Sequence, residues 1–408
     1  MDQAAPQSLH EELRRFRQFG RPTLCEMRPI ATELMPVYVN EFWTAKQRDA
    51  HALHEVSYRA CFKPQVPRFF IERLSQPGDV IYDPFSGRGT TALEAALLGR
   101  RVIANDINPL SRILAEPRFH PPQIEDVAAR LAEVPLDPGA QADIDLSMFY
   151  HSATLAEIVS LRNYLGARRE RGEEDAADRW IRMVATNRLT GHSPGFFSVY
   201  SFPPNQAVSA AAQSRINGKR QQTPDYRDVR KLILRKTVSL LKRISEQDRD
   251  RLRAADARFS ECDARRTPAI ADRSVQLSVT SPPFLDVVQY ADDNWLRCWF
   301  NRIDLDHVAA KVTATPRVQE WTDLIGATMR ELHRITRRGG HVAFEVGEVR
   351  GGTVKLEEHV IPPALAAGFV CEGVLIHEQS FTKTAHIWGV ANNRAGTNTH
   401  RIVLLRRR

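Results

Sequence analysis

Cysteine is scarce in this chain, and long apolar runs are missing. The five cysteines among its 408 residues, Cys25, Cys61, Cys262, Cys298 and Cys371, are scattered, and none forms a C-x-x-C pair. An odd, unpatterned set is typical of reduced thiols rather than of a disulfide framework or a zinc site, and no metal is expected. No run approaches the roughly 18 apolar residues of a membrane span, and the polar N-terminus lacks the apolar core of a secretory signal. The sequence therefore predicts a soluble, cytoplasmic protein.

Acidic residues are outnumbered by basic ones. The chain has 57 Lys and Arg against 49 Asp and Glu, a formal net charge of +8, which favours a polyanionic partner. The excess is concentrated between Gln213 and Arg243, where ten basic residues stand against two acids. Basic charge gathered in one stretch suits a nucleic-acid phosphate backbone, although a solvated helix face gives the same pattern. The residues expected to contact nucleic acid are Arg215, Lys219, Arg220, Arg227, Arg230 and Lys231.

The chain does contain a strand, a glycine loop, a helix and a second strand in close succession. "VIYD" (80–83) is a short apolar strand, "PFSGRG" follows it, "TTALEAALLG" is a helix rich in Ala and Leu, and "RVIAND" (101–106) is the second strand. This order opens a doubly wound α/β sheet. Residues 121–255 are mostly helical and highly charged, and the α/β alternation resumes near 257. We therefore predict one Rossmann-like sheet built from residues 1–120 and 256–408, with a helical insert at 121–255.

The glycine loop suits an adenosine ligand better than a dinucleotide or a nucleoside triphosphate. Gly87 and Gly89 allow a tight turn and a close backbone approach beside a helix N-terminus. Asp83 ends the first strand, and Asp106, which ends the second, can accept hydrogen bonds from both hydroxyls of a ribose. The third glycine of G-x-G-x-x-G is missing after Gly87 and Gly89, and no G-x-x-x-x-G-K-[ST] is present. A purely structural strand-to-helix turn is the alternative.

These motifs together resemble a known family. "DPFSGRGTT", "NDINPLS" and the later "TSPPF" resemble the S-adenosylmethionine-dependent amino-methyltransferases of DNA, over about 58–115 and 257–408. The resemblance implies a methyltransferase sheet with S-adenosyl-L-methionine held by the glycine loop, its ribose on Asp106 and its adenine against Ile107. "FKP" resembles the upstream cofactor segment, and "ECDAR" resembles the third motif, although the insert separates it unusually far from the second. The implied cofactor-binding residues are Lys63, Pro64, Asp83, Pro84, Phe85, Ser86, Gly87, Gly89, Thr90, Thr91, Asp106, Ile107 and Asp263.

"SPPF" resembles the catalytic tetrad of the family, which here is Ser281, Pro282, Pro283 and Phe284. An aromatic amino group is a poor nucleophile, because its lone pair is delocalised into the ring. Hydrogen-bond acceptors on its N–H groups aim that lone pair and stabilise the positive charge that develops on nitrogen. The Ser281 hydroxyl and the Pro282 carbonyl suit this role, the prolines fix the backbone, and Phe284 offers a face for stacking. A base in a duplex must be flipped out to reach such a loop; a simple Pro-Pro turn is the alternative.

The resemblance narrows the substrate to a few classes. Serine at the first position resembles the cytosine-N4 branch more than the adenine-N6 branch, so we expect site-specific methylation of cytosine N4 in double-stranded DNA, as in restriction–modification. Adenine-N6 methylation is the alternative. An RNA methyltransferase and a catalytically inactive DNA-binding module are more distant ones. A cognate restriction endonuclease and the oligomeric state are left open.

Two other features carry both a structural and a functional interpretation, and a third carries a functional one. The aromatic residues of "GHSPGFFSVYSFPPNQ" (191–206) suit either a base pocket or packing of the insert onto the sheet. Asp292 and Asp293 are more typical of a helix cap or a salt bridge than of a metal or acid–base pair. Near the C-terminus, Trp388 and Asn398 lie where the family has a late motif that helps to hold the flipped base.

Overall fold

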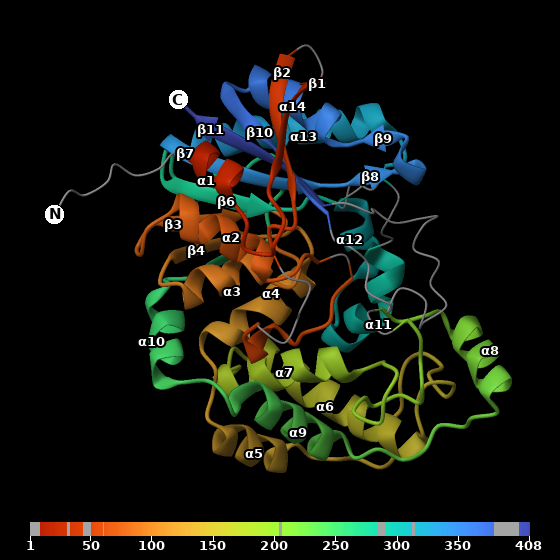
Figure 1. Cartoon of the computed structure of the whole chain (residues 1–408). Helices are drawn as coiled ribbons and strands as arrows, with labels where there is room; N and C mark the ends of the chain where they lie inside the picture. Colours follow the sequence, from red (N-terminus) through yellow and green to blue (C-terminus); the bar gives the residue numbers. More distant parts are fainter. Residues whose placement is uncertain are drawn as a thin grey trace.

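The core of the molecule is a nine-stranded mixed sheet (Figure 1). In spatial order its strands are β1 (Leu24–Ile30), β2 (Glu33–Asn40), β10 (Phe369–His377), β11 (His400–Arg407), β7 (Thr336–Val346), β6 (Val275–Thr280), β3 (Val80–Asp83), β4 (Arg101–Asn105) and β5 (Arg258–Ser260). A small separate pair is formed by β8 (Glu348–Val349) and β9 (Val354–Lys355). The computed structural model describes residues 9–30, 33–43, 50–59, 61–203, 206–283, 285, 290–311, 315–378 and 400–408.

Five neighbouring strands in the sheet are parallel. β7 pairs with β6, β6 with β3, β3 with β4, and β4 with β5, all in parallel register. β11 runs antiparallel to both β7 and β10. β3 ("VIYD") is apolar up to its last residue, as a strand covered on both faces requires, whereas β6 ("VQLSVT") alternates apolar with polar residues. The prediction of a doubly wound, Rossmann-like sheet is confirmed.

Helices cover both faces of the sheet. On one face α2 (Gln65–Leu74) and α3 (Thr90–Leu97) pack with β3 and β6 into one core. On the other face α13 (Val318–Ile335) and α14 (Glu357–Ala366) pack on β7, β10 and β11. Trp321, Ile325 and Met329 of α13 are spaced four residues apart and are all buried, as expected for one apolar stripe of a helix.

Residues 121–255 carry the helices α5 (Ile124–Glu133), α6 (Ser152–Glu170), α7 (Ala176–Arg188), α8 (Ala210–Arg220), α9 (Val229–Leu241) and α10 (Glu246–Ala254). They lie together below the sheet in Figure 1, so the predicted insert is mostly helical. α7 is the most enclosed of them: Trp180, Ile181 and Met183 are fully buried and belong to the same core as α3. The exact domain boundaries stay a prediction.

Short helices complete the described chain. These are α1 (Leu9–Arg15), η2 (Ala52–His54), α4 (Pro109–Ala115), η3 (Glu116–Phe119), α11 (Tyr290–Asn301), α12 (Leu305–Lys311) and η4 (Arg350–Gly352). None of the helices in the described ranges is both long and apolar enough to cross a membrane.

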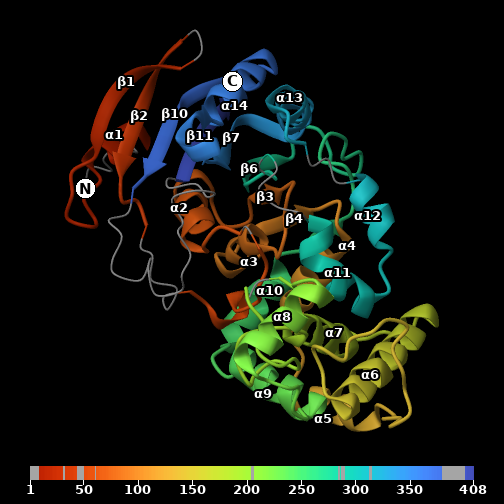
Figure 2. The same cartoon turned by 90° about the vertical axis from the view of Figure 1, so that its right-hand side faces the viewer.

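The β1–β2 hairpin extends the sheet at one edge, as Figure 2 shows. Both strands contain a proline, Pro29 and Pro36, and strands with proline are rare inside sheets. The side chains of Leu24, Met27 and Leu34 are largely exposed on it. The sequence analysis did not predict this hairpin.

Candidate functional site

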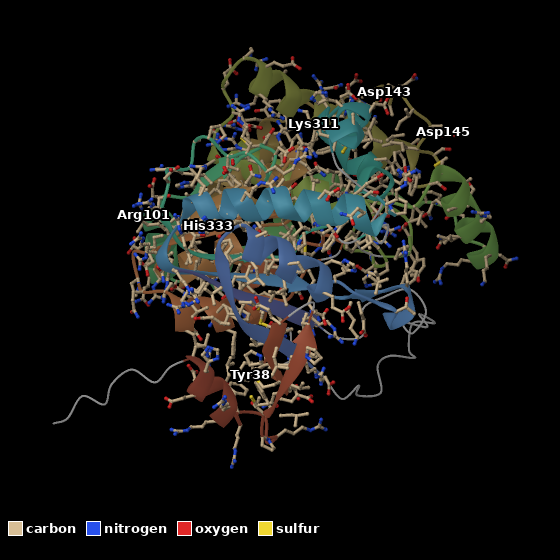
Figure 3. All side chains as sticks on the ribbon, turned by 90° about the horizontal axis from the view of Figure 1, so that it is seen from above. Tyr38, Arg101, Asp143, Asp145, Lys311 and His333 are labelled. Carbon is tan, nitrogen blue, oxygen red and sulfur yellow. The ribbon has the colours of Figure 1, made fainter. Side chains whose placement is uncertain are left out.

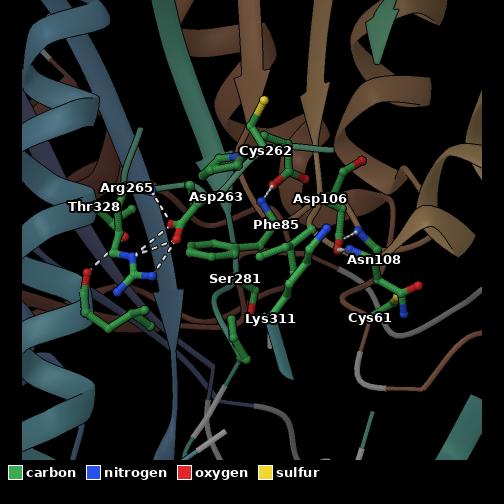
Figure 4. Close-up of a pocket in the computed structure, with 18 of the residues that line it drawn as sticks. Cys61, Phe85, Asp106, Asn108, Cys262, Asp263, Arg265, Ser281, Lys311 and Thr328 are labelled. Atoms are coloured by element: carbon green, nitrogen blue, oxygen red, sulfur yellow. Dashed lines mark hydrogen bonds and ion pairs between the residues drawn. The ribbon is translucent and has the colours of Figure 1, made fainter. Parts of the chain in front are cut away.

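A pocket opens at the carboxyl ends of β3, β4 and β6, beside the segment that follows β5 (Figure 4). Open α/β sheets bind ligands at this edge. In Figure 3, Arg101 at the start of β4 lies on the left and Lys311, which lines the pocket, lies to its right. The predicted site residues that line the pocket are Asp83, Pro84, Phe85, Ser86, Gly87, Thr90, Asp106, Ile107, Asp263, Ser281 and Pro283.

The glycine loop adopts a conformation that glycine takes without strain. Gly87 has a φ of 50° and Gly89 a φ of 75°, both in the left-handed region. A Cβ on Gly89 would lie 2.7 Å from the Cβ of Ala115 in α4. The Ser86 N–H donates to the Asn105 carbonyl at 2.9 Å, which ties the loop to β4. Gly87 therefore faces the pocket, whereas Gly89 allows α4 to pack behind the loop.

Asp83 ties the glycine loop to β6. Its Oδ1 accepts a hydrogen bond from Oγ1 of Thr280 at 2.6 Å and another from the N–H of Phe85 at 3.1 Å. Thr91 at the start of α3 donates to the Val279 carbonyl at 3.0 Å. Burial raises the pKa of Asp83 to about 7. These bonds fix the glycine loop and the strand before "SPPF" to each other.

Asp106 is oriented by two backbone amides. Its Oδ2 accepts from the N–H of Gly87 at 2.7 Å, and its Oδ1 accepts from the N–H of Asn108 at 2.9 Å. Burial raises the pKa of Asp106 to about 6. A carboxylate oxygen that accepts one hydrogen bond keeps capacity for another. Asp106 thus lines the pocket in a fixed orientation with acceptor capacity left, which suits the predicted contact with a ribose.

Asp263 reaches the pocket despite the insert that precedes it. Asn105 at the end of β4 donates to the Cys262 carbonyl at 2.8 Å and accepts from the Cys262 N–H at 2.9 Å. Arg265 donates from Nε to both oxygens of Asp263 at 2.9 Å and holds the pKa of that carboxyl below its usual range. The pairing of β5 with β4 therefore brings "ECDAR" beside the glycine loop.

The Ser-Pro-Pro loop enters the pocket from the end of β6. Ser281 is half-buried and lines the pocket together with Pro283, while Pro282 is buried. The Pro283 carbonyl accepts a hydrogen bond from Nε1 of the buried Trp321 at 2.8 Å, so α13 holds this loop from behind. Phe284 lies outside the described residues, and its stacking role stays a prediction.

The segment before α2 forms another wall of the pocket. Tyr58, Cys61 and Phe62 line it, whereas the predicted cofactor residues Lys63 and Pro64 do not. Pro64 is the N-cap of α2, and Lys63 is half-buried with its pKa lowered by burial. Gly89, Thr91 and Pro282 likewise support the loops from outside the lining.

Asp293 in α11 holds this wall in place. Nη1 of Arg59 lies 2.7 Å from each carboxylate oxygen of Asp293, so the salt-bridge interpretation of Asp293 is confirmed. Burial raises the pKa of Asp293. Asn187 of α7 accepts from the Ser57 N–H at 3.1 Å and donates to the Ser57 carbonyl at 2.9 Å. The described residues contain no group of three or more acidic, His or Cys side chains that could hold a metal ion.

Some lining residues were missed by the sequence analysis. Lys311 of α12 and Leu324 and Thr328 of α13 line the pocket, and no motif in their segments marks them. Asn108 also lines it and accepts a hydrogen bond from the N–H of Leu110 at 3.0 Å as the N-cap of α4. An Asn followed by Pro at a helix start is a capping signal that would have placed Asn108 at this edge.

The pocket residues fit S-adenosyl-L-methionine. Phe85 and Ile107 offer apolar faces for the adenine ring. Asp106 and Asp263 offer hydrogen-bond acceptors for the hydroxyl and amino groups of the nucleoside, and their negative charge suits a cationic ligand. The Oγ of Ser86 is buried and has no hydrogen-bond partner among the described residues, although it belongs to a residue that lines the pocket. A buried hydroxyl without a partner is unfavourable, so it suits a ligand group.

Three of the predicted nucleic-acid contacts, Arg227, Arg230 and Lys231, have partners within the protein. The side chain of Arg227 is 12% exposed and donates to the carbonyl oxygens of Phe196, at 2.9 Å, and of Ser198. Arg230 donates to the Val134 carbonyl. Lys231 forms an exposed ion pair with Asp228 at 3.0 Å. Arg227 and Arg230 therefore help to hold the insert together.

The other three, Arg215, Lys219 and Arg220, are exposed on α8. The guanidinium carbon of Arg220 lies 3.9 Å from the centre of the Tyr200 ring, which places this cation over an aromatic face. The two halves of the basic stretch thus differ in what their side chains contact.

In the segment 191–206, Phe196 and Phe197 pack inside the insert and do not line the pocket. Both side chains are buried, and Phe197 belongs to the main core. The guanidinium carbon of Arg188 lies 4.1 Å from the centre of the Phe196 ring. The late-motif candidates Trp388 and Asn398 lie outside the described residues.

Comparisons with known proteins find a match to a family model in the first part of the chain. The family model described as DNA methylase matches residues 10–114. The type II methyltransferase M.MjaII of Methanocaldococcus jannaschii is 32% identical over 89 residues, which are 22% of this chain and 16% of that protein. M.BsoBI of Geobacillus stearothermophilus, also a type II methyltransferase, is 41% identical over 64 residues, 15% of this chain and 13% of that protein. The resemblance to the DNA amino-methyltransferases is confirmed over this segment, and with it the cofactor of the family, S-adenosyl-L-methionine.

The matched segments are short. The chain covers less than a fifth of the length of these curated relatives. Among solved structures, TrmN from Thermus thermophilus is similar at a TM-score of 0.34 and 14% identity, over 86% of this chain and 50% of that chain.

Proposed function

We propose that this chain, a member of the DNA amino-methyltransferase family over residues 10–114, methylates the exocyclic N4 of cytosine in double-stranded DNA. The observation that carries the proposal is a single pocket that contains both Asp106 and Ser281. The bond between Asp83 and Thr280 locks the two strands that lead into it. A cofactor site alone would need only the first of these residues.

The cofactor would be held on three sides by the chain. Asp106 would accept hydrogen bonds from the ribose, Asp263 would lie near the adenine, and the Ser86 hydroxyl would gain the partner it lacks. When bound, S-adenosyl-L-methionine supplies an electrophilic methyl group on a sulfonium.

The Ser-Pro-Pro loop would activate the target amino group. The hydroxyl oxygen of Ser281 and the carbonyl oxygen of Pro282 accept hydrogen bonds from its two N–H groups, so its lone pair turns toward the methyl carbon. The nitrogen lone pair would form the new N–C bond as the C–S bond breaks with its electron pair staying on sulfur, and the nitrogen would then release one proton to solvent water. Because the base must leave the duplex to reach Ser281, base flipping is part of the proposal.

Serine at position 281 favours cytosine, and adenine N6 is the second candidate, since it presents an amino group of the same kind. We further propose that the insert at 121–255 recognises the target sequence. The curated relatives are named type II methyltransferases, which supports a role in restriction–modification beside a cognate endonuclease.

The test is to incubate the protein with unmethylated genomic DNA and isotope-labelled S-adenosylmethionine, and to identify the labelled nucleosides by mass spectrometry. N4-methyldeoxycytidine is the expected product. N6-methyldeoxyadenosine would keep the mechanism and overturn the choice of base. Label found only in RNA offered in parallel would overturn the DNA substrate.

A further inference from the structure

Helix α8 presents a basic stripe without acidic residues. Ala211, Ser214, Arg215, Gly218 and Lys219 are all exposed, and their spacing of three and four residues puts them on one face of the helix. The helix has no acidic residue, and the sequence around it, from residue 179 to residue 224, has none either. This face is therefore positive and carries small residues between its longer side chains.

The opposite side of α8 is anchored by amide side chains. Gln213 is buried and donates to the Tyr200 carbonyl at 3.0 Å, and Asn217 donates to the Met148 carbonyl at 2.7 Å. Gln222 donates to the same Tyr200 carbonyl at 2.9 Å. These bonds fix the rotation of the helix, so the basic stripe has one orientation.

The chain just before α8 contacts the helix that follows the Ser-Pro-Pro loop. The N–H of Ala207 donates to the Asp293 carbonyl at 3.3 Å, and Nε1 of Trp295 donates to the Val208 carbonyl at 3.3 Å. Figures 1 and 2 both place α8 on the side of the molecule that carries α11. A duplex that delivers a base to Ser281 would therefore pass near α8.

We propose that α8 enters a groove of the DNA and that Arg215 and Lys219 read base edges there. This inference rests on the proposed function. An α-helix with its side chains is about 10–12 Å across, which suits a major groove about 12 Å wide, and the eleven residues of α8 give about three turns to lie in it. Arg and Lys donate to the O6 and N7 of guanine, and Ser214 can contact either kind of base. Gly218 lets the helix axis approach the bases closely.

The first test compares target preference. Wild type, Arg215→Gln and Lys219→Gln methylate the same genomic DNA, and sequencing of the methylated positions gives the motif of each. We expect each variant to lose about tenfold to a hundredfold in discrimination at one base pair. Lys242→Gln is the matched control: Lys242 is exposed and caps the end of α9 that leads to α10. Figure 1 shows α10 on the opposite side of the molecule from α8.

The second test uses steric bulk instead of charge. A Cβ at Gly218 would meet no atom within 4 Å, so Gly218→Gln leaves the free protein undisturbed. In a groove the added side chain would meet DNA, and affinity for a labelled 30-bp duplex should fall about tenfold or more by fluorescence anisotropy. The midpoint of thermal unfolding should not fall below that of the wild type, since Gln is a better helix former than Gly, and calorimetric cofactor binding should be unchanged.

Three results would separate the explanations. Unchanged motifs for Arg215→Gln and Lys219→Gln, with unchanged affinity for Gly218→Gln, would overturn the inference. A uniform loss of affinity for every duplex, with a shallower salt dependence, would mean that α8 contacts only phosphates. If the wild type binds the duplex but methylates nothing, the proposed function fails, whereas the Gly218→Gln comparison still tests α8.

Discussion

The glycine loop and the basic stretch of the insert were both expected to bind ligands. They differ in how well the residue types alone predict whether the segment faces a ligand site or packs inside the protein. In the loop, backbone geometry sets the conformation: Gly87 and Gly89 have positive φ values, and Asp106 accepts a hydrogen bond from the main chain beside them. In the basic stretch, the direction of each long side chain sets what it contacts. The Arg227 side chain is 12% exposed and turned inward, whereas that of Lys231 is 83% exposed. A motif built on backbone geometry is therefore easier to interpret from sequence than a run of charge.

The largest expected change in stability that tests this comparison is at Asp83, the carboxylate that ties the glycine loop to β6. Burial raises the pKa of Asp83 to about 7 from an ordinary 3.8. Between about pH 4 and pH 7 the native state holds a proton that the unfolded state has lost, so wild-type stability falls as pH rises through this window. Asp83→Asn keeps an oxygen for Thr280 and cannot titrate. The difference in free energy of unfolding, variant minus wild type, should therefore grow by up to about 4 kcal/mol between pH 4 and pH 8.

Urea unfolding of both proteins across this pH range measures the difference, to which Asp106 adds a smaller part because its charge interacts with that of Asp83. Parallel stability curves would show that the Asp83 carboxyl does not carry the burial penalty.

Much of the site could be predicted from sequence because its residues lie at the carboxyl ends of strands. Asp83 and Asp106 close two neighbouring parallel strands, and parallel strands bring their carboxyl ends to one edge. Ser281 follows β6 in the same way. Lys311 and Thr328 could not be predicted, because they reach the pocket from helices whose position depends on tertiary packing.

The same limit applies to the fold. β3 and β4 are short apolar runs between turn signals, and both were predicted. The β1–β2 hairpin was not, because Pro29 and Pro36 argue against strands and its pairing with β10 joins distant parts of the chain.

The second prediction separates the two requirements for glycine in the loop. Gly89→Ala puts a side chain on a residue with a positive φ, and its Cβ would lie 2.7 Å from the Cβ of Ala115. The variant should therefore lose about 3 kcal/mol of stability and bind the cofactor more weakly. Gly78→Ala is the control, since Gly78 also has a positive φ, of 86°, but a Cβ there meets nothing within 4 Å. That variant should lose only about 1 kcal/mol. Equal losses in thermal unfolding would mean that backbone strain alone makes Gly89 necessary.

The third prediction divides the pocket into its two functions. Ser281→Ala should slow methyl transfer into DNA about 100-fold, because the developing charge on nitrogen loses an acceptor, while cofactor affinity stays unchanged. Asp106→Asn should do the reverse and weaken cofactor binding about tenfold, since a hydrogen bond to a charged group is stronger than one to a neutral group. Calorimetry with the cofactor and single-turnover transfer of a labelled methyl group measure both. A Ser281→Ala protein that fails to bind the cofactor would contradict this division.

The smallest effects test the basic stretch itself. Arg227→Met leaves buried carbonyl oxygens without a donor and should lower the free energy of unfolding by about 2 kcal/mol. Lys231→Met removes an exposed ion pair and should change it by less than about 0.5 kcal/mol. Urea unfolding gives both values, and duplex binding at low and moderate salt shows whether either residue also contacts phosphate. If the two variants lose equal stability and equal DNA affinity, the direction of the side chain does not matter, and the contrast between the loop and the charged run disappears. If only Arg227→Met is destabilised, two cations four residues apart in one run perform different tasks because one has carbonyl oxygens within reach and the other has solvent.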